Sequence, residues 1–542
     1  MKNIAKIREK LVFDVAIVGA GVAGLSAGIK LKQLDPNLEI CILEKSSTIG
    51  GQVLSGCQFN PRALYELIPN WQQLSSPLTT KVSKSQYLYL TKSSNYKIPD
   101  SLTPWNNYSD DYVISLSELC RWLKTISDSL NIRIFESFTA KDLIYSNIGA
   151  VEGILTGEIG LNPDHSFSDT YQPGLDILAK QTILAEGANG NLSEQAINSF
   201  KLLGYHDLQY HSEPQTYSLG FKEVWTNPNI APGLAFHTFG WPLSNSRSRG
   251  FLYTDKEKVH IGLISGLDYT NPNINLYEEF QKFKTHKFFK DYLKGDCIEF
   301  GAKVLDDGGF FSVPKLSAPG VLIAGSAGGM SNPITGQGAH LAMKSGIIAA
   351  ETIYSNWGLE QKEKNAYYKA YVNSWAFEEL YKVRNMRQAF NNSAFFGLFY
   401  SWLNWKNANT KSSVFIENSI KGDNYAASEC TRSALESKKI EYLEKDGELA
   451  VDNIVSFERT GTLYRDQPQF VKVKGRNEKN VALSYLKYGG IEEKICPTGV
   501  FKYNGIQLEI DSSKCILCGA CGIKSFREMI KVELPESGTG PN

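Results

Sequence analysis

The chain has 542 residues, of which 42% are hydrophobic and 21% charged, with 57 basic and 57 acidic side chains. This length exceeds the roughly 250–300 residues at which one core stops growing, so we expect two or three domains. The balanced charge gives no global field that favours nucleic acid, and no apolar run reaches the roughly 18 residues of a spanning helix. The basic start, MKNIAKIREKLV, lacks an apolar signal core, which predicts a reducing compartment where clustered cysteines indicate metal binding rather than disulfides.

The N-terminal segment predicts a dinucleotide-binding unit. Residues 14–18 have the pattern of a buried strand and run directly into Gly19-Ala20-Gly21-Val22-Ala23-Gly24. In this G-x-G-x-x-G pattern the first glycine allows a tight turn, the second lets the backbone approach the pyrophosphate, and the third lets the helix pack on its strand. Glu44 closes the next strand and is placed to accept hydrogen bonds from ribose hydroxyls.

Two later segments favour FAD over NAD. Residues 181–190, QTILAEGANG, predict a strand that ends in Glu186 and Gly187. Residues 320–346 predict a strand, a glycine-rich turn and a helix, with amides around Gly336 to Gly338 facing the flavin ring. The predicted FAD residues in this segment are Gly325, Ser326, Asn332, Gly336, Gln337 and Gly338. A second G-x-G-x-x-G pattern is absent from the sequence, so no nicotinamide site is evident.

The middle of the chain predicts a β-rich insertion and an interfacial element. Residues 98–130 and 201–300 carry aromatic, β-rich patterns that suit a sheet-based substrate domain inserted into the FAD domain. Residues 391–407, NNSAFFGLFYSWLNWKN, crowd six aromatic residues between polar flanks in a segment too short to span a bilayer. This pattern suits an element that dips into a membrane interface, and the alternative is a buried aromatic helix. Residues 63–74 are a weaker candidate of the same kind.

A cysteine cluster lies near the C-terminus. Cys515, Cys518 and Cys521 have C-x2-C-x2-C spacing, which can wrap a short loop around three corners of an iron–sulfur cube. The Cys-Pro pair at Cys496 supplies the fourth thiolate, as in bacterial ferredoxins, where a Cys-Pro ligates a cluster other than that of its own triplet. We therefore predict one [4Fe-4S] cluster. Zinc is the competing interpretation, although no histidine follows His340.

From Phe13 to Pro541 the chain resembles the electron-transfer flavoprotein:ubiquinone oxidoreductase family. The resemblance rests on motifs that have no generic structural reason to recur, namely FDVAIVGAG, LEKSSTIGGQVLSG, EPQTYSLGFKEVW, GWPL, GGFFSVPKL, ELYKVRN and CPTGV, besides the cysteine triplet. It implies FAD, one [4Fe-4S] cluster, a quinone pocket reached from the bilayer, a soluble electron-transfer flavoprotein as donor, and attachment to one membrane face. It also implies that Lys45, Ser55 and Gly56 contribute to the FAD site.

The chain departs from the family pattern at three places. A Gly pair that usually contacts the quinone is replaced within Ser248-Arg249-Gly250, which we predict as the quinone segment. A usual Tyr is Phe501, and a common Thr is Ala520. Both changes remove hydroxyls that could donate to cluster sulfur atoms, and such hydrogen bonds raise the reduction potential. We therefore expect a lower cluster potential than in relatives that carry the hydroxyls.

The expected fold is α/β: a two-dinucleotide-binding-type FAD flavoprotein, with a Rossmann-like FAD domain and an inserted β-rich quinone domain, plus a C-terminal ferredoxin-like [4Fe-4S] domain. We expect the FAD domain at 1–97, 131–200 and 301–355, the quinone domain at 98–130 and 201–300, a helical region at 356–420, and the cluster domain at 421–542.

The predicted activity is electron transfer from a reduced electron-transfer flavoprotein through FAD and the cluster to ubiquinone or menaquinone. The alternatives are a flavin-dependent reductase of isoprenoid lipids, a flavodoxin or ferredoxin:quinone oxidoreductase linked to nitrogen fixation, and a redox-responsive binding protein without turnover. We expect a monomer that binds no nucleic acid. Its predicted location is the cytoplasmic face of a bacterial inner membrane, or the matrix face in a mitochondrion.

Overall fold

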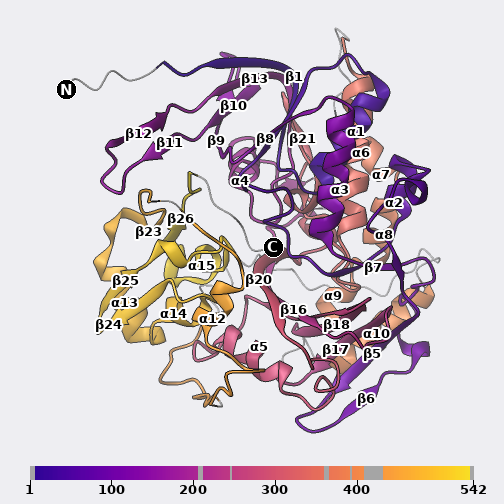
Figure 1. Ribbon diagram of the computed structural model, residues 1–542, viewed down its shortest axis with the longest axis vertical. Helices are drawn as coiled ribbons and strands as arrows, with labels where there is room; N and C mark the ends of the chain where they lie inside the picture. Colours follow the sequence, from indigo (N-terminus) through magenta and orange to yellow (C-terminus); the bar gives the residue numbers. More distant parts are fainter. Residues whose placement is uncertain are drawn as a thin grey trace.

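The computed structural model describes residues 7–205, 211–243, 247–358, 365–390, 394–407, 431–442, 444–464 and 466–536. The predicted boundary at residue 420 lies outside these ranges. Figure 1 shows an upper α/β part, a lower antiparallel sheet, and a C-terminal part, coloured orange to yellow, beside that sheet.

The first part is built on an eight-stranded sheet. Its parallel strands are buried on both faces, as expected for a sheet covered by helices. The main strand order is β21 (Ser317–Ala318), β22 (Val321–Ile323), β13 (Asp176–Leu184), β1 (Lys10–Val18), β2 (Ile40–Glu44) and β8 (Arg133–Glu136), with β10 (Val151–Thr156) and β9 (Ala140–Tyr145) adding antiparallel strands. Between β10 and β13 the chain forms a separate two-stranded sheet from β11 (Ile159–Leu161) and β12 (Phe167–Gln172).

Helices form one shared core with this sheet. Apolar residues of α1 (Val22–Leu34), α3 (Leu116–Ser129) and α6 (Ala339–Ser355) are buried together against it. On the other face, α4 (Asn191–Ser199) contributes Leu192 and Ala196 to a second core. The predicted quinone segment 98–130 therefore contains α3, which belongs to the helical layer of the FAD domain, because its apolar stripe packs on α1.

The second part is a seven-stranded, mostly antiparallel sheet. Its order is β20 (Cys297–Asp306), β16 (Tyr217–Thr226), β19 (Lys258–Gly266), β18 (Arg249–Asp255), β17 (Leu234–Gly240), β5 (Lys84–Leu90) and β6 (Asn95–Lys97). Strands β5 and β6 fall within the predicted FAD segment 1–97, yet they extend this sheet, because β5 pairs with β17 in parallel. Strand β20 runs past the predicted boundary at residue 300. One helix, α5 (Leu276–Lys284), packs on the sheet.

Small elements connect the two sheets. They are the three-stranded sheet β3 (Cys57–Phe59), β7 (Tyr112–Ile114) and β4 (Thr80–Lys81), and the pair β14 (Gly204–Tyr205) and β15 (His211–Ser212). The predicted segment 63–74 forms α2 (Arg62–Leu67) and a 3-10 turn over Trp71–Gln73. Its large apolar side chains Leu64, Leu67, Ile68 and Trp71 are buried in the core of the first part, and Tyr65 and Leu74 are exposed.

The helical region follows α6. It consists of α7 (Ala366–Val372), α8 (Trp375–Val383), α9 (Met386–Ala389) and α10 (Ala394–Asn407), and α10 lies beside the β5–β6 edge of the seven-stranded sheet (Figure 1). No helix in the described ranges is long and apolar enough to cross a bilayer.

The C-terminal part packs on the seven-stranded sheet. It contains α12 (Asn453–Glu458), α13 (Glu478–Tyr488), α14 (Ile491–Ile495) and α15 (Ala520–Lys524), with the strand pairs β23 (Val471–Val473) to β26 (Ile530–Val532) and β24 (Phe501–Asn504) to β25 (Gln507–Ile510). Its buried residues, including all four predicted cluster cysteines, share one hydrophobic core with strands β16, β19 and β20.

Candidate functional site

A cavity of about 830 Å³ extends from the carboxyl end of β1 to the seven-stranded sheet and the C-terminal part. Most of the residues predicted for FAD line it, and they come from four separate stretches of the chain. They are Gly19, Gly21, Glu44, Lys45, Gly56, Glu186, Gly187, Gly325, Ser326, Asn332, Gly336, Gln337 and Gly338. The predicted quinone residues Arg249 and Gly250 line the same cavity.

The glycine motif leaves room at the start of α1. An added Cβ at Gly21 would meet nothing within 4 Å, so the backbone faces open space where a pyrophosphate could approach the helix N-terminus. Gly19 has φ 102°, and a Cβ there would lie 2.4 Å from the carbonyl oxygen of Ala185. A Cβ at Gly24 would lie 2.0 Å from the carbonyl oxygen of Gly19, so Gly24 serves close packing and lies outside the cavity wall.

Glu44 is held rigidly at the end of β2. Its Oε2 accepts from the backbone N–H of Ala20 at 3.0 Å, and its Oε1 accepts from that of Ser46 at 2.9 Å. Ala20 therefore does not line the cavity, but its N–H fixes the position of the Glu44 carboxylate. Because each carboxylate oxygen can accept more than one hydrogen bond, the fixed carboxylate can still accept from a ribose hydroxyl.

Three predicted side chains have other partners. Ser55 Oγ lies 2.8 Å from Ser115 Oγ at the start of α3, and Ser248 Oγ lies 2.9 Å from Ser265 Oγ, so neither side chain lines the cavity. The Glu186 carboxylate lines it but accepts from the N–H and the hydroxyl of Ser193, both at 2.7 Å. Glu186 therefore caps the first turn of α4, and burial raises its pKa.

The sheet end of the cavity is aromatic. Tyr87, His237, Phe239 and Tyr253 line it, and the His237 ring stacks on Tyr87 with 4.7 Å between centroids. Burial and the nearby Arg249 guanidinium lower the pKa of His237 to about 4, so this imidazole is neutral at physiological pH. A flat lobe of this kind suits a planar, uncharged ring such as a quinone.

A buried hydrogen-bond chain links this lobe to the glycine-rich turn before α6. His237 Nε2 lies 3.1 Å from Gln58 Oε1, and Gln58 Nε2 donates to Asp111 at 2.7 Å. Gln337 Nε2 donates to the same carboxylate at 3.0 Å. The Asp111 carboxylate thus fixes the orientation of two amides that line the cavity.

Arg249 belongs to a group of buried charges. Its guanidinium donates to the carbonyl oxygen of Pro333 and lies 3.8 Å from Asp307, and Arg247 and Arg387 also contact that carboxylate. Despite burial, these three cations lower the pKa of Asp307. The Nε atom of Arg249 is buried without a partner in the described structure, and other atoms of this side chain line the cavity.

The four predicted cluster cysteines converge. Cys496, Cys515, Cys518 and Cys521 are each at most 9% exposed and line one small cavity together with Phe501. The N–H of Val500 donates to Cys496 Sγ at 3.3 Å, and that of Leu517 donates to Cys515 Sγ at 3.4 Å. In the described ranges no three His, Cys, Asp or Glu side chains are arranged to hold a single metal ion. A cube takes its thiolates at separate corners, so it does not require the four sulfur atoms to surround one ion.

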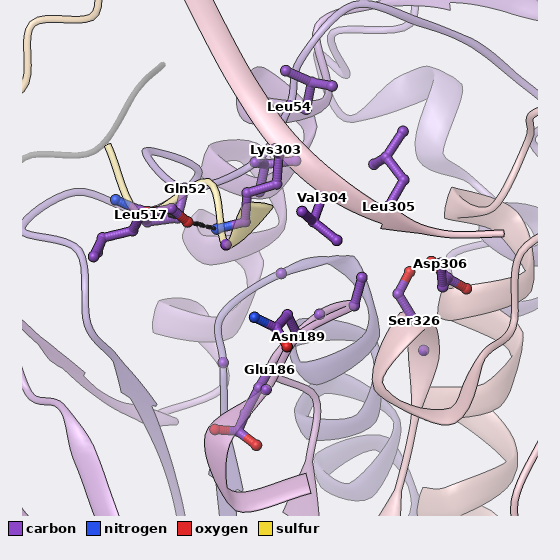
Figure 2. Close-up of a pocket in the computed structure, with 18 of the residues that line it drawn as sticks. Gln52, Leu54, Glu186, Asn189, Lys303, Val304, Leu305, Asp306, Ser326 and Leu517 are labelled. Carbon is purple, nitrogen blue, oxygen red and sulfur yellow. Dashed lines mark hydrogen bonds between the residues drawn. The ribbon is translucent and has the colours of Figure 1, made fainter. Parts of the chain in front are cut away.

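The two cavities share a wall. Gly519 and Val532 line both of them, and the N–H of Val304 on β20 donates to the carbonyl oxygen of Cys518 at 2.9 Å. Figure 2 shows Lys303, Val304, Leu305 and Asp306 of β20 along the larger cavity, with Leu517 of the cysteine loop beside Lys303.

Sequence reasoning missed several residues of this site. Gln52, Asn189, Lys303, Asp306, Gln58 and His237 all line the large cavity. Gln52 lies within LEKSSTIGGQVLSG and Asn189 within QTILAEGANG, so the sequence carries a signal for both. Lys303 and Asp306 lie in a β-strand of the other domain. The packing of β20 against the cysteine loop brings Lys303 to the site, and Asp306 lies beside Ser326 (Figure 2).

Known protein families match the segment that forms most of the seven-stranded sheet and the C-terminal part that carries the cysteines. Residues 217–305 match the family described as ETF-QO, ubiquinone-binding, and residues 447–542 match electron transfer flavoprotein-ubiquinone oxidoreductase, 4Fe-4S. Residues 1–66 match the Thi4 family. Among solved structures, a geranylgeranyl bacteriochlorophyll reductase-like protein from Thermoplasma acidophilum has a TM-score of 0.54 at 15% identity and covers 75% of this chain and 94% of its own. That similarity shows a shared fold.

Relatives of similar length extend the match to nearly the whole chain. The mitochondrial electron transfer flavoprotein-ubiquinone oxidoreductase of Oryza sativa is 37% identical, covering 98% of this chain and 93% of the relative. The human protein of the same name is 34% identical, covering 99% and 90%. The chain therefore belongs to the electron transfer flavoprotein-ubiquinone oxidoreductase family.

Proposed function

We propose that this oxidoreductase accepts electrons from a reduced electron transfer flavoprotein and delivers them to a membrane quinone through the two cavities described above. FAD occupies the large cavity, with its pyrophosphate at the start of α1 and its ribose at Glu44. Cys496, Cys515, Cys518 and Cys521 hold the [4Fe-4S] cluster. When bound, FAD supplies a carrier for two electrons and the cluster a carrier for one.

The observation that supports this arrangement best is the shared wall. Gly519 and Val532 separate the cysteine-lined cavity from the large one, so two redox groups placed there are neighbours. The cysteines fit a cluster because all four are buried and line one cavity, and two of their sulfur atoms accept hydrogen bonds from backbone N–H groups. The glycine turn fits FAD because it leaves the space that a phosphate needs.

For the quinone we propose the aromatic lobe between Tyr87, His237 and Tyr253, with Arg249 and Gly250 at its wall. The neutral His237 is held by Gln58, and the Arg249 side chain lines the cavity beside it. These residues bind and orient the quinone ring and keep bulk water away from it.

The membrane contact is proposed at α10. Phe395, Phe396 and Phe399 are exposed, Phe395 to 81%, whereas Leu398 and Tyr400 of the same helix are buried. Leu398 packs in one apolar cluster with Tyr87 and Phe239, which line the quinone lobe. The exposed aromatic face therefore lies on the route by which a lipid-soluble quinone would reach the cavity. We propose that this face rests on the cytoplasmic side of a bacterial inner membrane, or on the matrix side in a mitochondrion.

Two variants test the cofactor assignment separately. Cys518→Ala should lose the EPR signal of the reduced cluster and retain the FAD absorbance, whereas Gly21→Val should lose FAD and retain the EPR signal. Cys41→Ala, at a buried cysteine of β2 that lines neither cavity, is the matched control and should keep both signals. Retention of FAD in Gly21→Val, or of the cluster in Cys518→Ala, would refute the assignment.

Turnover and membrane binding need their own measurements. Anaerobic stopped-flow mixing of the wild type with its reduced donor flavoprotein should reduce FAD, and a short-chain quinone should reoxidise it. Replacing Phe395 and Phe399 with Ser should abolish cosedimentation with anionic vesicles, while Leu486→Ser, an exposed apolar residue on α13, should leave it unchanged. Equal vesicle binding by both variants would exclude α10 as the contact.

A further inference from the structure

Lys303 lines the large cavity where that cavity meets the cysteine loop. Its ammonium group lies 3.4 Å from Gln52 Oε1, in the loop that follows β2, and 3.4 Å from the carbonyl oxygen of Leu517, in the cysteine loop. The neighbouring Val304 is bound through its N–H to the carbonyl oxygen of Cys518. Figure 2 shows Lys303 with Gln52 and Leu517 at one end of the large cavity.

Its partners carry no formal charge. Among the described residues no carboxylate lies within ion-pair distance of Lys303, in contrast to Lys472 on the same cavity wall, which pairs with Glu533 at 2.8 Å. The charged groups that influence Lys303 are the cation Lys45, the carboxylate of Glu44 and the sulfur atoms of Cys515 and Cys518. A cation without a counter-ion, held away from bulk water, exerts its field on whatever charge is added nearby.

This inference rests on the proposed cofactor sites and goes beyond them. We propose that Lys303 is an electrostatic positioning residue whose positive charge stabilises an added electron on either side of the shared wall, and so favours the reduced state of both cofactors. Its hydrogen bonds to Gln52 and Leu517 hold that charge between the two sites. Both sites gain negative charge on reduction, so one fixed cation serves both.

The test measures midpoint potentials rather than turnover. Lys303→Met removes the charge, and Lys303→Gln removes the charge but keeps an N–H donor for the carbonyl oxygen of Leu517. Titrations of the holoprotein would follow the cluster by EPR and FAD by its visible absorbance. They should run near pH 6, well below the ordinary pKa of a lysine amine, so that Lys303 is charged.

In both variants we expect the equilibrium constant for one-electron reduction of the cluster to fall about tenfold, a shift of about 59 mV to lower potential, with a decrease for FAD as well. Lys303→Arg restores the charge and should restore both potentials. Lys502→Met makes the same charge change at an exposed position of the C-terminal part, where water screens it, and should leave both potentials unchanged.

Three outcomes would overturn the proposal. Unchanged potentials in Lys303→Gln would show that the hydrogen bond matters rather than the charge. Equal shifts in Lys502→Met would show a general effect of net charge. Loss of FAD or cluster in both Lys303 variants would make the residue structural. Absence of FAD or of the cluster signal in the wild type would instead refute the proposed function, so the two failures are distinguishable.

Discussion

At the scale of single residues, Asp306 combines burial with a position on the wall of the large cavity. Its side chain is 6% exposed, lies beside Ser326 (Figure 2), and has one carboxylate oxygen without a partner in the described structure. Burial raises its pKa from 3.8 to about 6. Between those values the folded protein binds more protons than the unfolded chain, so stability falls as pH rises through this range and stays lower above it.

Asp306→Asn should remove the loss of stability that ionisation of Asp306 causes as the pH rises. At about pH 8 we expect the variant to exceed the wild type by on the order of 2–3 kcal/mol, since one pKa unit corresponds to about 1.4 kcal/mol. Near pH 4 the two should unfold alike. Thermal unfolding across this pH range measures the difference, with the exposed Asp296→Asn as the control for net charge. A difference that persists at pH 4 would contradict the role assigned to ionisation.

Phe501 and Ala520 carry a second prediction at this scale. Phe501 lines the cysteine cavity, and Ala520 is fully buried between Cys518 and Cys521. Phe501→Tyr and Ala520→Thr each add a hydroxyl that can donate to cluster sulfur, so both should raise the cluster midpoint potential. An EPR-monitored redox titration checks this, and midpoints equal to that of the wild type would contradict it.

At the scale of elements, the sequence predicted those parts of the site that lie in local motifs. The strand, glycine turn and acid at 14–44 and the cysteine triplet carry their chemistry within short spacings, and the structure places them around the two cavities. Segment boundaries were less accurate. Strand β5 lies within the expected FAD segment 1–97, but it pairs with β17, and that contact joins residues far apart in the chain. Lys303 and Asp306 on β20 could not be predicted for the same reason, because they reach the site through contacts between residues far apart in the chain.

Helix α5 contains a buried ion pair that fixes it to the sheet. Lys284 Nζ donates to both carboxylate oxygens of Glu223 on β16 at 2.8 Å, and both side chains are fully buried. Removing one partner leaves an uncompensated charge, so Lys284→Met should lower the free energy of unfolding by about 3–5 kcal/mol. Adding Glu223→Leu should recover most of this loss in chemical denaturation. If the double variant is no more stable than Lys284→Met, repacking rather than the unpaired charge causes the effect.

At the scale of the whole molecule, the C-terminal part and the seven-stranded sheet share one hydrophobic core. Phe470, Ile495 and the cluster cysteines share a single core with Leu219 of β16 and Val304 of β20, whereas α1 and α6 belong to a separate core around the eight-stranded sheet. The cluster would therefore stabilise the sheet that carries the aromatic lobe, because the cysteines and this sheet share the same core. The glycine-motif end of the large cavity is held by the separate core around the eight-stranded sheet.

Loss of the cluster should therefore loosen the molecule unevenly. In Cys518→Ala, hydrogen exchange followed by mass spectrometry should show faster exchange in β16 and β20 as well as in the C-terminal part, because these elements lose shared packing together. Strands β1 and β13 and helix α6 should keep wild-type protection, since their core does not include the cysteines. Faster exchange confined to the C-terminal part would show that it unfolds independently of the sheet. Faster exchange throughout the chain would show one cooperative unit that includes the FAD domain.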